Sequence, residues 1–227
     1  MTEIPLTMAD AATALRAGDL TSVALTAACF AAADRLDETL GVYIKRYDET
    51  ALAAASAADA ELAAGVDKGP LHGMPIGIKD IIACAESETT ANSVVYDADW
   101  YAGMDAPVIT RLRAAGAVLT GKVTTMEYAI GLPDESKPYP VPRNPWDPAT
   151  WPGGSSSGSG AGVAAGMFMG ALGTDTGGSI RIPAAFCGIT GMKQTYGLVP
   201  KAGCLPLGVT LVHIGPMTRS VADAAAM

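Results

Sequence analysis

The sequence predicts an α/β protein in which a central sheet is covered by helices on both faces. Apolar residues make up 49% of the 227 residues and charged residues only 17%, and glycine (26) and proline (15) are both plentiful. This composition suits an α/β enzyme better than a helical bundle. Segments with strand character also alternate with segments of helical character, which is typical of a sheet packed between helices.

The first 65 residues are predicted to be mainly helical, because they consist of alanine-rich segments separated by glycines. Three glycines stand where these helices would end: Gly18, Gly41 and Gly65. Thr21 and Asp48 are the expected N-caps, since short polar side chains satisfy free backbone N–H groups at helix starts. Between the second and third helices, residues 42–44 are expected to form a short strand.

Residues 66–227 are predicted to contain the catalytic core within the same single domain. We expect strands over residues 74–82 and 117–120, with a helix over residues 107–115 between them. Seven prolines between residues 131 and 152 argue against regular structure there. That stretch is either an ordered surface excursion or a linker, and a core that continues beyond it is favoured because apolar sequence follows.

The final residues, 220–227, begin as a helix and stop without a capping residue or a charge in the last turn. We therefore expect the chain to be the amino-terminal portion of a longer domain, incomplete at its carboxyl terminus. The low charge after Glu135 predicts apolar surface that the rest of the protein would cover. The 227-residue segment alone is accordingly expected to be inactive and poorly soluble.

The charge balance excludes several classes of partner. The formal net charge is −8 and the pI is about 4.7, whereas nucleic-acid binding needs clustered Lys and Arg to neutralise phosphates. Anionic membrane surfaces are disfavoured for the same reason. No stretch approaches the ~20 apolar residues of a membrane helix, and no basic segment precedes an apolar run at the start. We expect a cytoplasmic protein that contacts neither nucleic acid nor membrane.

Cysteine and histidine are both scarce. The four cysteines form no CxxC pair, so buried free thiols are favoured over a zinc or redox site: Cys29, Cys84, Cys187 and Cys204. The two histidines, His72 and His213, lie beside glycine or apolar residues, and we interpret them as structural. A Ser-His-Asp triad is therefore disfavoured.

Three segments contain the residues most suited to chemistry: 73–80 (GMPIGIKD), 153–160 (GGSSSGSG) and 173–181 (GTDTGGSIR). The second is either a flexible linker or a turn built for backbone geometry or hydroxyl chemistry, and the apolar residues directly after it favour the turn. The third places Ser179 after two glycines, which can aim successive N–H groups at an oxyanion or a phosphate. Asp175 and Arg181 flank this turn and are expected to hold its shape.

A nucleotide site is disfavoured. No lysine lies in or just after either glycine cluster, as a phosphate-binding loop would require. Residues 116–123 (GAVLTGKV) match part of that pattern, but Val123 stands where magnesium needs a hydroxyl group. The middle of this segment also has the character of a strand.

Lys79 has two interpretations. It is either a surface lysine paired with Asp80 at a strand end, or a desolvated lysine whose pKa is lowered because burial disfavours the charged form. A neutral lysine is a competent general base near pH 7.

Taken together, the three segments resemble the amidase signature family. Its pattern combines Gly-x-Pro-x-x-x-Lys-Asp, Gly-Gly-Ser-Ser and Gly-Thr-Asp-x-Gly-Gly-Ser-Ile-Arg, in the order found here. Lys79 precedes Ser155 by 76 residues, and Ser155 precedes Ser179 by 24. Shorter similarities follow at residues 143–147, 186–188, 191–193, 196–197 and 214–216. The resemblance runs from about Gly69 to the last residue, and family members are roughly twice as long as this chain.

The resemblance implies a mixed, twisted central sheet and assigns site residues by position. Ser179 becomes the nucleophile, Ser155 the proton relay and Lys79 the base. The oxyanion hole is expected to consist of the backbone N–H groups of Thr176, Gly177, Gly178 and Ser179. Structural support is expected from Ser156, Asp175 and Arg181. The peptide bond between Gly154 and Ser155 is expected to be cis.

The implied reaction is acyl transfer followed by hydrolysis. Neutral Lys79 takes a proton from Ser155, Ser155 takes one from Ser179, and Ser179 attacks the carbonyl carbon of an amide, hydrazide or urea. Neither a metal nor an organic cofactor is implied. The expected partner is a small amide-type substrate, and a homodimer is an open alternative.

Three residues depart from the family pattern: Ser157, Gly160 and Val212. They spare the proposed catalytic positions but weaken any transfer of a particular substrate. Two alternatives stand beside the amide hydrolase. One is the glutamine-hydrolysing subunit of a tRNA-dependent amidotransferase, although residues 131–139 and the surroundings of Val212 do not resemble that branch. The other is a catalytically silent scaffold, because sequence motifs can persist in a protein that has lost its activity.

Overall fold

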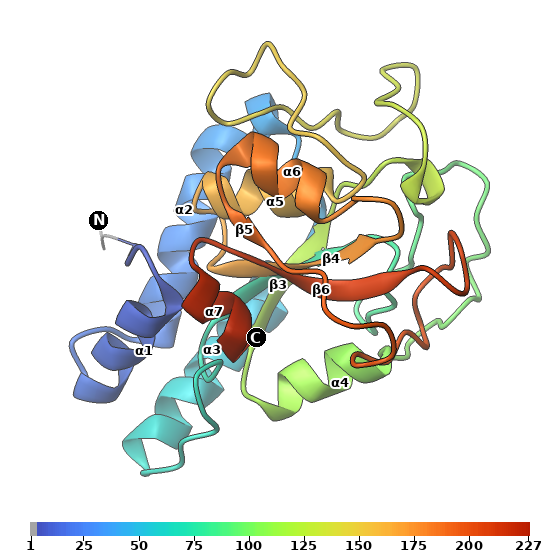
Figure 1. The fold of residues 1–227 in the computed structure, drawn as a ribbon. Helices are drawn as coiled ribbons and strands as arrows, with labels where there is room; N and C mark the ends of the chain where they lie inside the picture. Colours follow the sequence, from blue (N-terminus) through green and yellow to red (C-terminus); the bar gives the residue numbers. More distant parts are fainter. Residues whose placement is uncertain (1–3) are drawn as a thin grey trace.

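A mixed sheet of six strands forms the centre of the molecule in the computed structural model, which describes residues 4–227 (Figure 1). In spatial order the strands are β1 (Tyr43–Arg46), β3 (Val118–Val123), β2 (Pro75–Lys79), β4 (Gly170–Asp175), β6 (His213–Thr218) and β5 (Thr190–Gly191). β2 runs parallel to both of its neighbours, and the remaining pairs are antiparallel. The predicted mixed α/β class is confirmed.

Helices cover both faces of this sheet. They are α1 (Met8–Ala17), α2 (Ser22–Leu40), α3 (Asp48–Ala63), α4 (Pro107–Ala114), α5 (Ser157–Ala164), α6 (Arg181–Cys187) and α7 (Val221–Ala226), with a 3-10 turn η1 at Glu127–Ala129. Figure 1 shows α5 and α6 on one side of the sheet and α4 on the other. The core follows this division, because Ile78 clusters with Ile109 of α4, whereas Val123 clusters with Val163 of α5.

The helical start of the chain largely follows its capping residues. Gly18 and Gly41 end α1 and α2 in the left-handed conformation that favours glycine. The Thr21 hydroxyl accepts a hydrogen bond from the Ala24 N–H, as an N-cap should. The expectation for Asp48 was wrong by one residue: Tyr47 is the cap, and α3 begins at Asp48. The Asp48 carboxylate instead forms an ion pair with Arg46.

All three strand predictions found a strand but placed its ends wrongly. The strand expected over residues 74–82 ends at Lys79, because the N–H groups of Ile81 and Ile82 turn back to the Lys79 carbonyl oxygen. The strand at 117–120 extends further than expected, since Val118 to Val123 pairs with both β1 and β2. The short strand expected at residues 42–44 begins one residue later and ends at Arg46, and the expected helix at 107–115 is present as α4.

The Gly/Ser-rich segment is not a linker. Residues 157–163 lie fully inside the protein and form most of α5. Glycine is needed at position 158 because a Cβ there would lie 2.6 Å from the Thr124 backbone N and 2.8 Å from the Val42 carbonyl oxygen. These are backbone atoms, so they cannot rotate aside as a side chain would.

We expect Gly158→Ala to destabilise the full-length protein by about 2 kcal/mol, because the added methyl group overpacks a helix that lies against backbone. Urea unfolding gives the free energy directly. Gly208→Ala is the matched control, since the nearest atom to its added Cβ, in Thr176, lies at an ordinary 3.4 Å. Equal stabilities of the two variants would contradict the packing argument.

The proline-rich stretch, residues 131–152, contains neither a helix nor a strand, as predicted, and only an isolated bridge between Asn144 and Asp147 interrupts it. After this stretch, β4 pairs directly with β2. The chain therefore returns to the same sheet, which places the two later motifs beside the first one.

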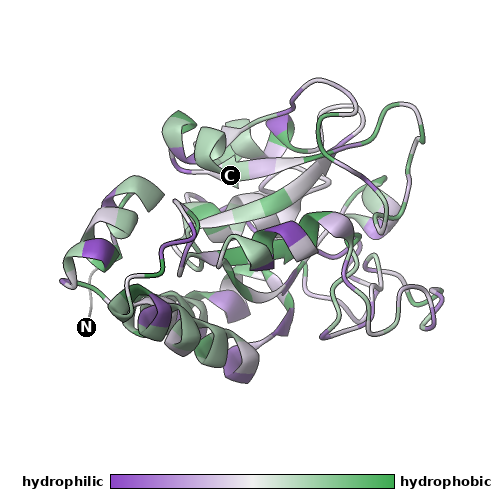
Figure 2. Cartoon of the chain, turned by 90° about the horizontal axis from the view of Figure 1, so that it is seen from below, coloured by the Kyte–Doolittle hydropathy of each residue, from purple (hydrophilic) through white to green (hydrophobic). Residues whose placement is uncertain are grey.

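Polarity and hydropathy follow the layers. In Figure 2 the strongest purple falls mainly on outer helices and loops, and much of the interior is white or green. All four cysteines are free and buried, as expected. Among the helices of the described range, residues 4–227, none has both the length and the apolar character that crossing a bilayer requires.

Candidate active site

The Lys79 side chain is completely buried at the carboxyl end of β2. Its Nζ atom lies 2.7 Å from Ser155 Oγ, 2.9 Å from Ser156 Oγ and 2.8 Å from Thr174 Oγ1. The two serines directly precede α5, and Thr174 belongs to the neighbouring strand β4. Three hydroxyl groups from two motifs therefore surround one amine, and the interpretation of Lys79 as a surface lysine paired with Asp80 was wrong.

The electrostatic surroundings of Lys79 favour its neutral form. Burial lowers the pKa of Lys79 to about 7, and only weaker effects of Cys204 and Asp175 act in the opposite direction. Asp80 does not pair with Lys79, because its Oδ1 atom lies 3.0 Å from Lys122 Nζ. Lys79 is therefore poised to exchange a proton near neutral pH.

Backbone contacts fix the position of Ser155. The Ser155 carbonyl oxygen accepts hydrogen bonds from the Thr125 hydroxyl at 2.9 Å and the Met126 N–H at 3.2 Å. The peptide bond between Gly154 and Ser155 is cis, as the resemblance led us to expect. No sequence pattern indicated the role of Thr125, since it lies in a loop outside the three motifs.

Ser156 links the other two motifs. Its hydroxyl donates to the Thr174 carbonyl oxygen at 3.2 Å and accepts from the Thr174 N–H at 3.1 Å. Its own N–H donates to the Ser179 carbonyl oxygen at 3.1 Å. The resemblance implied that Ser156 supports the site, and these contacts are consistent with that role. Thr174 belongs to the third motif, but its contact with Lys79 was not predicted.

Ser179 is half-buried at the turn after β4. Its backbone lies against Ser156, but its hydroxyl makes no hydrogen bond to another residue of the described part of the chain. The structure thus brings Lys79 and Ser155 into direct contact. The backbone hydrogen bond from Ser156 holds Ser179 beside this pair. The Ser179 and Ser155 hydroxyl groups are not hydrogen-bonded to each other in this arrangement.

The turn before Ser179 is organised by the Asp175 carboxylate. It accepts the Arg181 guanidinium at 3.0 Å and also the N–H groups of Gly178 (2.8 Å) and Ile180 (3.2 Å). Burial raises the pKa of Asp175, but the bonds from Arg181 and the backbone outweigh it and hold the pKa below its usual value.

The Gly178 N–H is therefore already committed to a carboxylate. The N–H groups of Thr176, Gly177 and Ser179 have no acceptor within residues 4–227. Three of the four groups assigned to an oxyanion hole are available to a ligand, and the fourth helps to shape the turn instead.

Both histidines lie outside this hydroxyl network. The His72 ring contacts Glu61 at 2.8 Å, and the His213 ring contacts the Leu211 carbonyl oxygen at 2.6 Å. The partial nucleotide motif is likewise structural, because most of it forms β3 and its Lys122 is buried. A histidine base and a phosphate loop are thus both unsupported.

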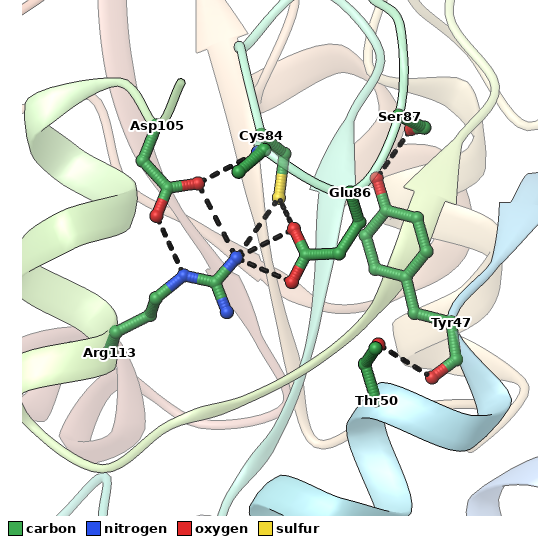
Figure 3. Close-up of polar contacts among 8 residues, drawn as sticks. Tyr47, Thr50, Cys84, Glu86, Ser87, Asp105 and Arg113 are labelled. Carbon is green, nitrogen blue, oxygen red and sulfur yellow. Dashed lines mark hydrogen bonds and ion pairs between the residues drawn. The ribbon is translucent and has the colours of Figure 1, made fainter. Parts of the chain in front are cut away.

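Only one cluster in the described residues has donor atoms close enough for a metal ion: Cys84, Glu86 and Asp105. Figure 3 shows the Arg113 guanidinium among these groups, 2.6 Å from Glu86 and 2.7 Å from Asp105. Burial and the contact with Glu86 also raise the pKa of the Cys84 thiol to about 12, the opposite of what a thiolate ligand requires. The cluster is an arginine clamp, and we assign it no metal.

Residues 24–227 match the family model Amidase, so the chain belongs to the amidase family. It is 49% identical to a glutamyl-tRNA(Gln) amidotransferase subunit of Chloroflexus aurantiacus, over 100% of this chain and 47% of that protein.

Solved structures of amidases have the same fold. The native peptide amidase of Stenotrophomonas maltophilia matches with a TM-score of 0.89 and 39% identity, over 97% of this chain and 46% of that one. A fatty acid amide hydrolase matches with a TM-score of 0.87 and 26% identity, over 97% and 40%. The chain spans about half the length of the curated relatives it matches.

Proposed function

We propose that this chain carries the catalytic residues of an amide hydrolase, with Ser179 as nucleophile, Ser155 as proton relay and Lys79 as base. The observation that supports this most directly is the buried amine of Lys79, 2.7 Å from the Ser155 hydroxyl and without a carboxylate bonded to it. Amide hydrolysis by a serine needs such a base, and neither histidine is placed to supply it.

The hydrogen bonds around Lys79 support proton transfer from Ser155. The Ser156 hydroxyl proton is directed to the Thr174 carbonyl oxygen, so at Lys79 this hydroxyl can only accept. A neutral amine has two N–H groups and one lone pair. If the N–H groups are donated to Ser156 and Thr174, the lone pair is left for the Ser155 hydroxyl.

The turn around Ser179 suits a developing negative charge. The free N–H groups of Thr176, Gly177 and Ser179 can stabilise the oxyanion that forms when Ser179 attacks a carbonyl carbon. Gly178 is left out of this set, because its N–H donates to Asp175. Preorganised donors of this kind contribute to the rate without rearrangement during the reaction.

In the proposed reaction the Ser179 oxygen bonds to the carbonyl carbon, while its proton passes to Ser155 and the Ser155 proton passes to Lys79. The proton then returns through Ser155 to the leaving nitrogen, and the C–N bond breaks to give an acyl ester on Ser179. Water attacks the ester through the same relay and releases the acid. The substrate is a small amide, hydrazide or urea.

This reaction needs no metal, so incubation with EDTA is expected to leave turnover of the full-length protein unchanged. The measurement is the hydrolysis rate before and after chelation and dialysis. Loss of activity with EDTA and recovery with a divalent ion would instead indicate a metallohydrolase.

A second candidate function is supply of ammonia from glutamine within an amidotransferase, because the 49% identical relative is named as such a subunit. The two functions differ in substrate. We would compare turnover of the full-length protein on glutamine and on a panel of simple aryl amides, hydrazides and ureas. Preference for the panel supports the free-standing hydrolase, and preference for glutamine supports the amidotransferase role. Absence of any turnover supports a silent scaffold.

A further inference from the structure

A second buried lysine lies close to the proposed base. Lys122 of β3 is fully buried, and its Nζ atom contacts Asp80 Oδ1 at 3.0 Å, the Ile82 carbonyl oxygen at 2.7 Å and Thr89 Oγ1 at 2.9 Å. The proposed reaction uses none of these contacts. A buried ion pair contributes little to stability on balance, because desolvating two charges offsets their attraction. Such a pair beside a catalytic lysine therefore calls for another explanation.

The two lysines point to opposite faces of the sheet. In the parallel pairing of β2 and β3, Lys122 lies opposite Ile78, which belongs to the core cluster beneath α4. Lys79 lies opposite Val123, which belongs to the core cluster beneath α5. Because successive side chains alternate along a strand, Lys122 cannot share the hydroxyl groups that surround Lys79.

Asp80 follows Lys79 directly, yet both of its carboxylate oxygens are bonded elsewhere. Oδ1 accepts from Lys122, and Oδ2 accepts the Thr90 hydroxyl at 2.6 Å and the Thr90 N–H at 3.1 Å. Without Lys122, the adjacent buried carboxylate would lack its cation. The closest alternative cation along the chain would be Lys79.

The loop that follows Asp80 is also held from outside. Arg113 of α4 donates to both carboxylate oxygens of Glu86 at 2.6 Å, and the Tyr47 hydroxyl lies 2.6 Å from the Ser87 hydroxyl (Figure 3). Lys122 binds the same loop from inside. Residues 80–90 are thus fixed on both sides, which keeps the Asp80 carboxylate directed away from the base.

We propose that Lys122 is a positioning residue for this reaction: by holding Asp80 in a buried ion pair on the opposite face of the sheet, it keeps Lys79 free to accept a proton. This inference rests on the proposed function of Lys79. A carboxylate within about 4 to 6 Å would favour the ammonium form of the base and so remove its lone pair.

The other ionisable groups near Lys79 leave this role to Lys122. Asp175 is already neutralised by Arg181. The Cys204 thiol stays protonated at neutral pH, because burial raises its pKa to about 12. Asp80 is therefore the remaining carboxylate near Lys79, and its cationic partner is Lys122.

The test replaces Lys122 by Met in the full-length protein, which removes the charge and keeps much of the volume. We expect turnover at pH 7 to fall at least about tenfold, with partial recovery near pH 9 and little change in KM. The acid limb of the pH–rate profile, where the rate falls as the pH is lowered, should shift to higher pH by about one unit or more. Lys122→Gln, whose amide can still donate to the Ile82 carbonyl oxygen, gives the same comparison if the Met variant does not fold.

The double variant Asp80→Asn with Lys122→Met is the matched control. It removes both charges, so the acid limb is expected to return toward its wild-type position. The proposal would be overturned if folded Lys122→Met kept the wild-type acid limb. It would also be overturned if the acid limb of the double variant stayed at the higher pH.

Covalent labelling of Ser179 by a fluorophosphonate, followed against pH, separates this inference from the proposed function. If the inference alone is wrong, the wild-type protein still labels with an acid limb near pH 7, and that limb is the same after Lys122→Met. If the proposed function is wrong, the wild-type protein shows no such limb, or Lys79→Met labels as fast as wild type.

Discussion

Replacing Ser179 by Ala is expected to lower kcat for amide hydrolysis by about 10⁴-fold or more, because the nucleophile is removed and no acyl ester can form. The turn should keep its shape, since Asp175 holds it through Arg181 and the Gly178 N–H rather than through the Ser179 hydroxyl. The measurement is kcat and KM on whichever amide the wild-type protein turns over fastest.

Ser56→Ala, on the exposed side of α3, is the matched control for the loss of one hydroxyl group and should keep wild-type activity. Unfolding curves would show that both variants are folded. Activity of Ser179→Ala within tenfold of wild type would contradict the assignment of Ser179 as the nucleophile.

Replacing Lys79 by Ala is expected to lower kcat by about 10³-fold or more while leaving substrate binding nearly unchanged, since a base acts in the transition state. Lys79→Arg should not restore the rate, because a guanidinium stays protonated at any working pH. The wild-type rate should also fall as the pH drops below about 7, where the buried amine becomes protonated and loses its lone pair.

Lys45→Arg, at an exposed position of β1, is the control for a lysine exchange without effect. Turnover of Lys79→Arg close to wild type would show that the residue supplies only charge or packing. The relay through Ser155 would then need a different base.

The sequence was sufficient to predict the fold class, because it depends on features repeated along the chain. Glycines such as Gly18 and Gly41 mark helix ends through their backbone freedom, and alternation of strands and helices does not depend on any single residue. Strand ends were harder to place. β2 stops at Lys79 because the following backbone N–H groups turn toward the Lys79 carbonyl oxygen. No local sequence pattern indicates that turn.

For the Gly/Ser segment, the neighbouring sequence was sufficient to favour a buried turn over a linker. Its composition alone matches a flexible linker, but the apolar residues after it indicated a buried turn, and α5 is buried. The reason becomes visible only in three dimensions, where Gly158 lies against the backbone of Thr124. Packing of this kind joins residues that are distant along the chain.

The site itself was only partly visible in the sequence. Motif order pointed to Lys79, Ser155 and Ser179, but not to Thr125 or Lys122. Thr125 binds the Ser155 carbonyl oxygen from a loop, and Lys122 binds Asp80 from the opposite face of the sheet. Both contacts depend on how strands and loops meet in space.

Capture of the covalent intermediate tests most directly whether Ser179 is the nucleophile. The full-length protein would be mixed with an amide that it hydrolyses, quenched in acid during steady turnover, and digested for peptide mass spectrometry. We expect the peptide containing Ser179 to gain the mass of the acyl group, and this adduct to be absent in Ser179→Ala. An adduct on Ser155 or on another residue, or full turnover without any adduct after rapid quenching at several times, would contradict the assignment of Ser179.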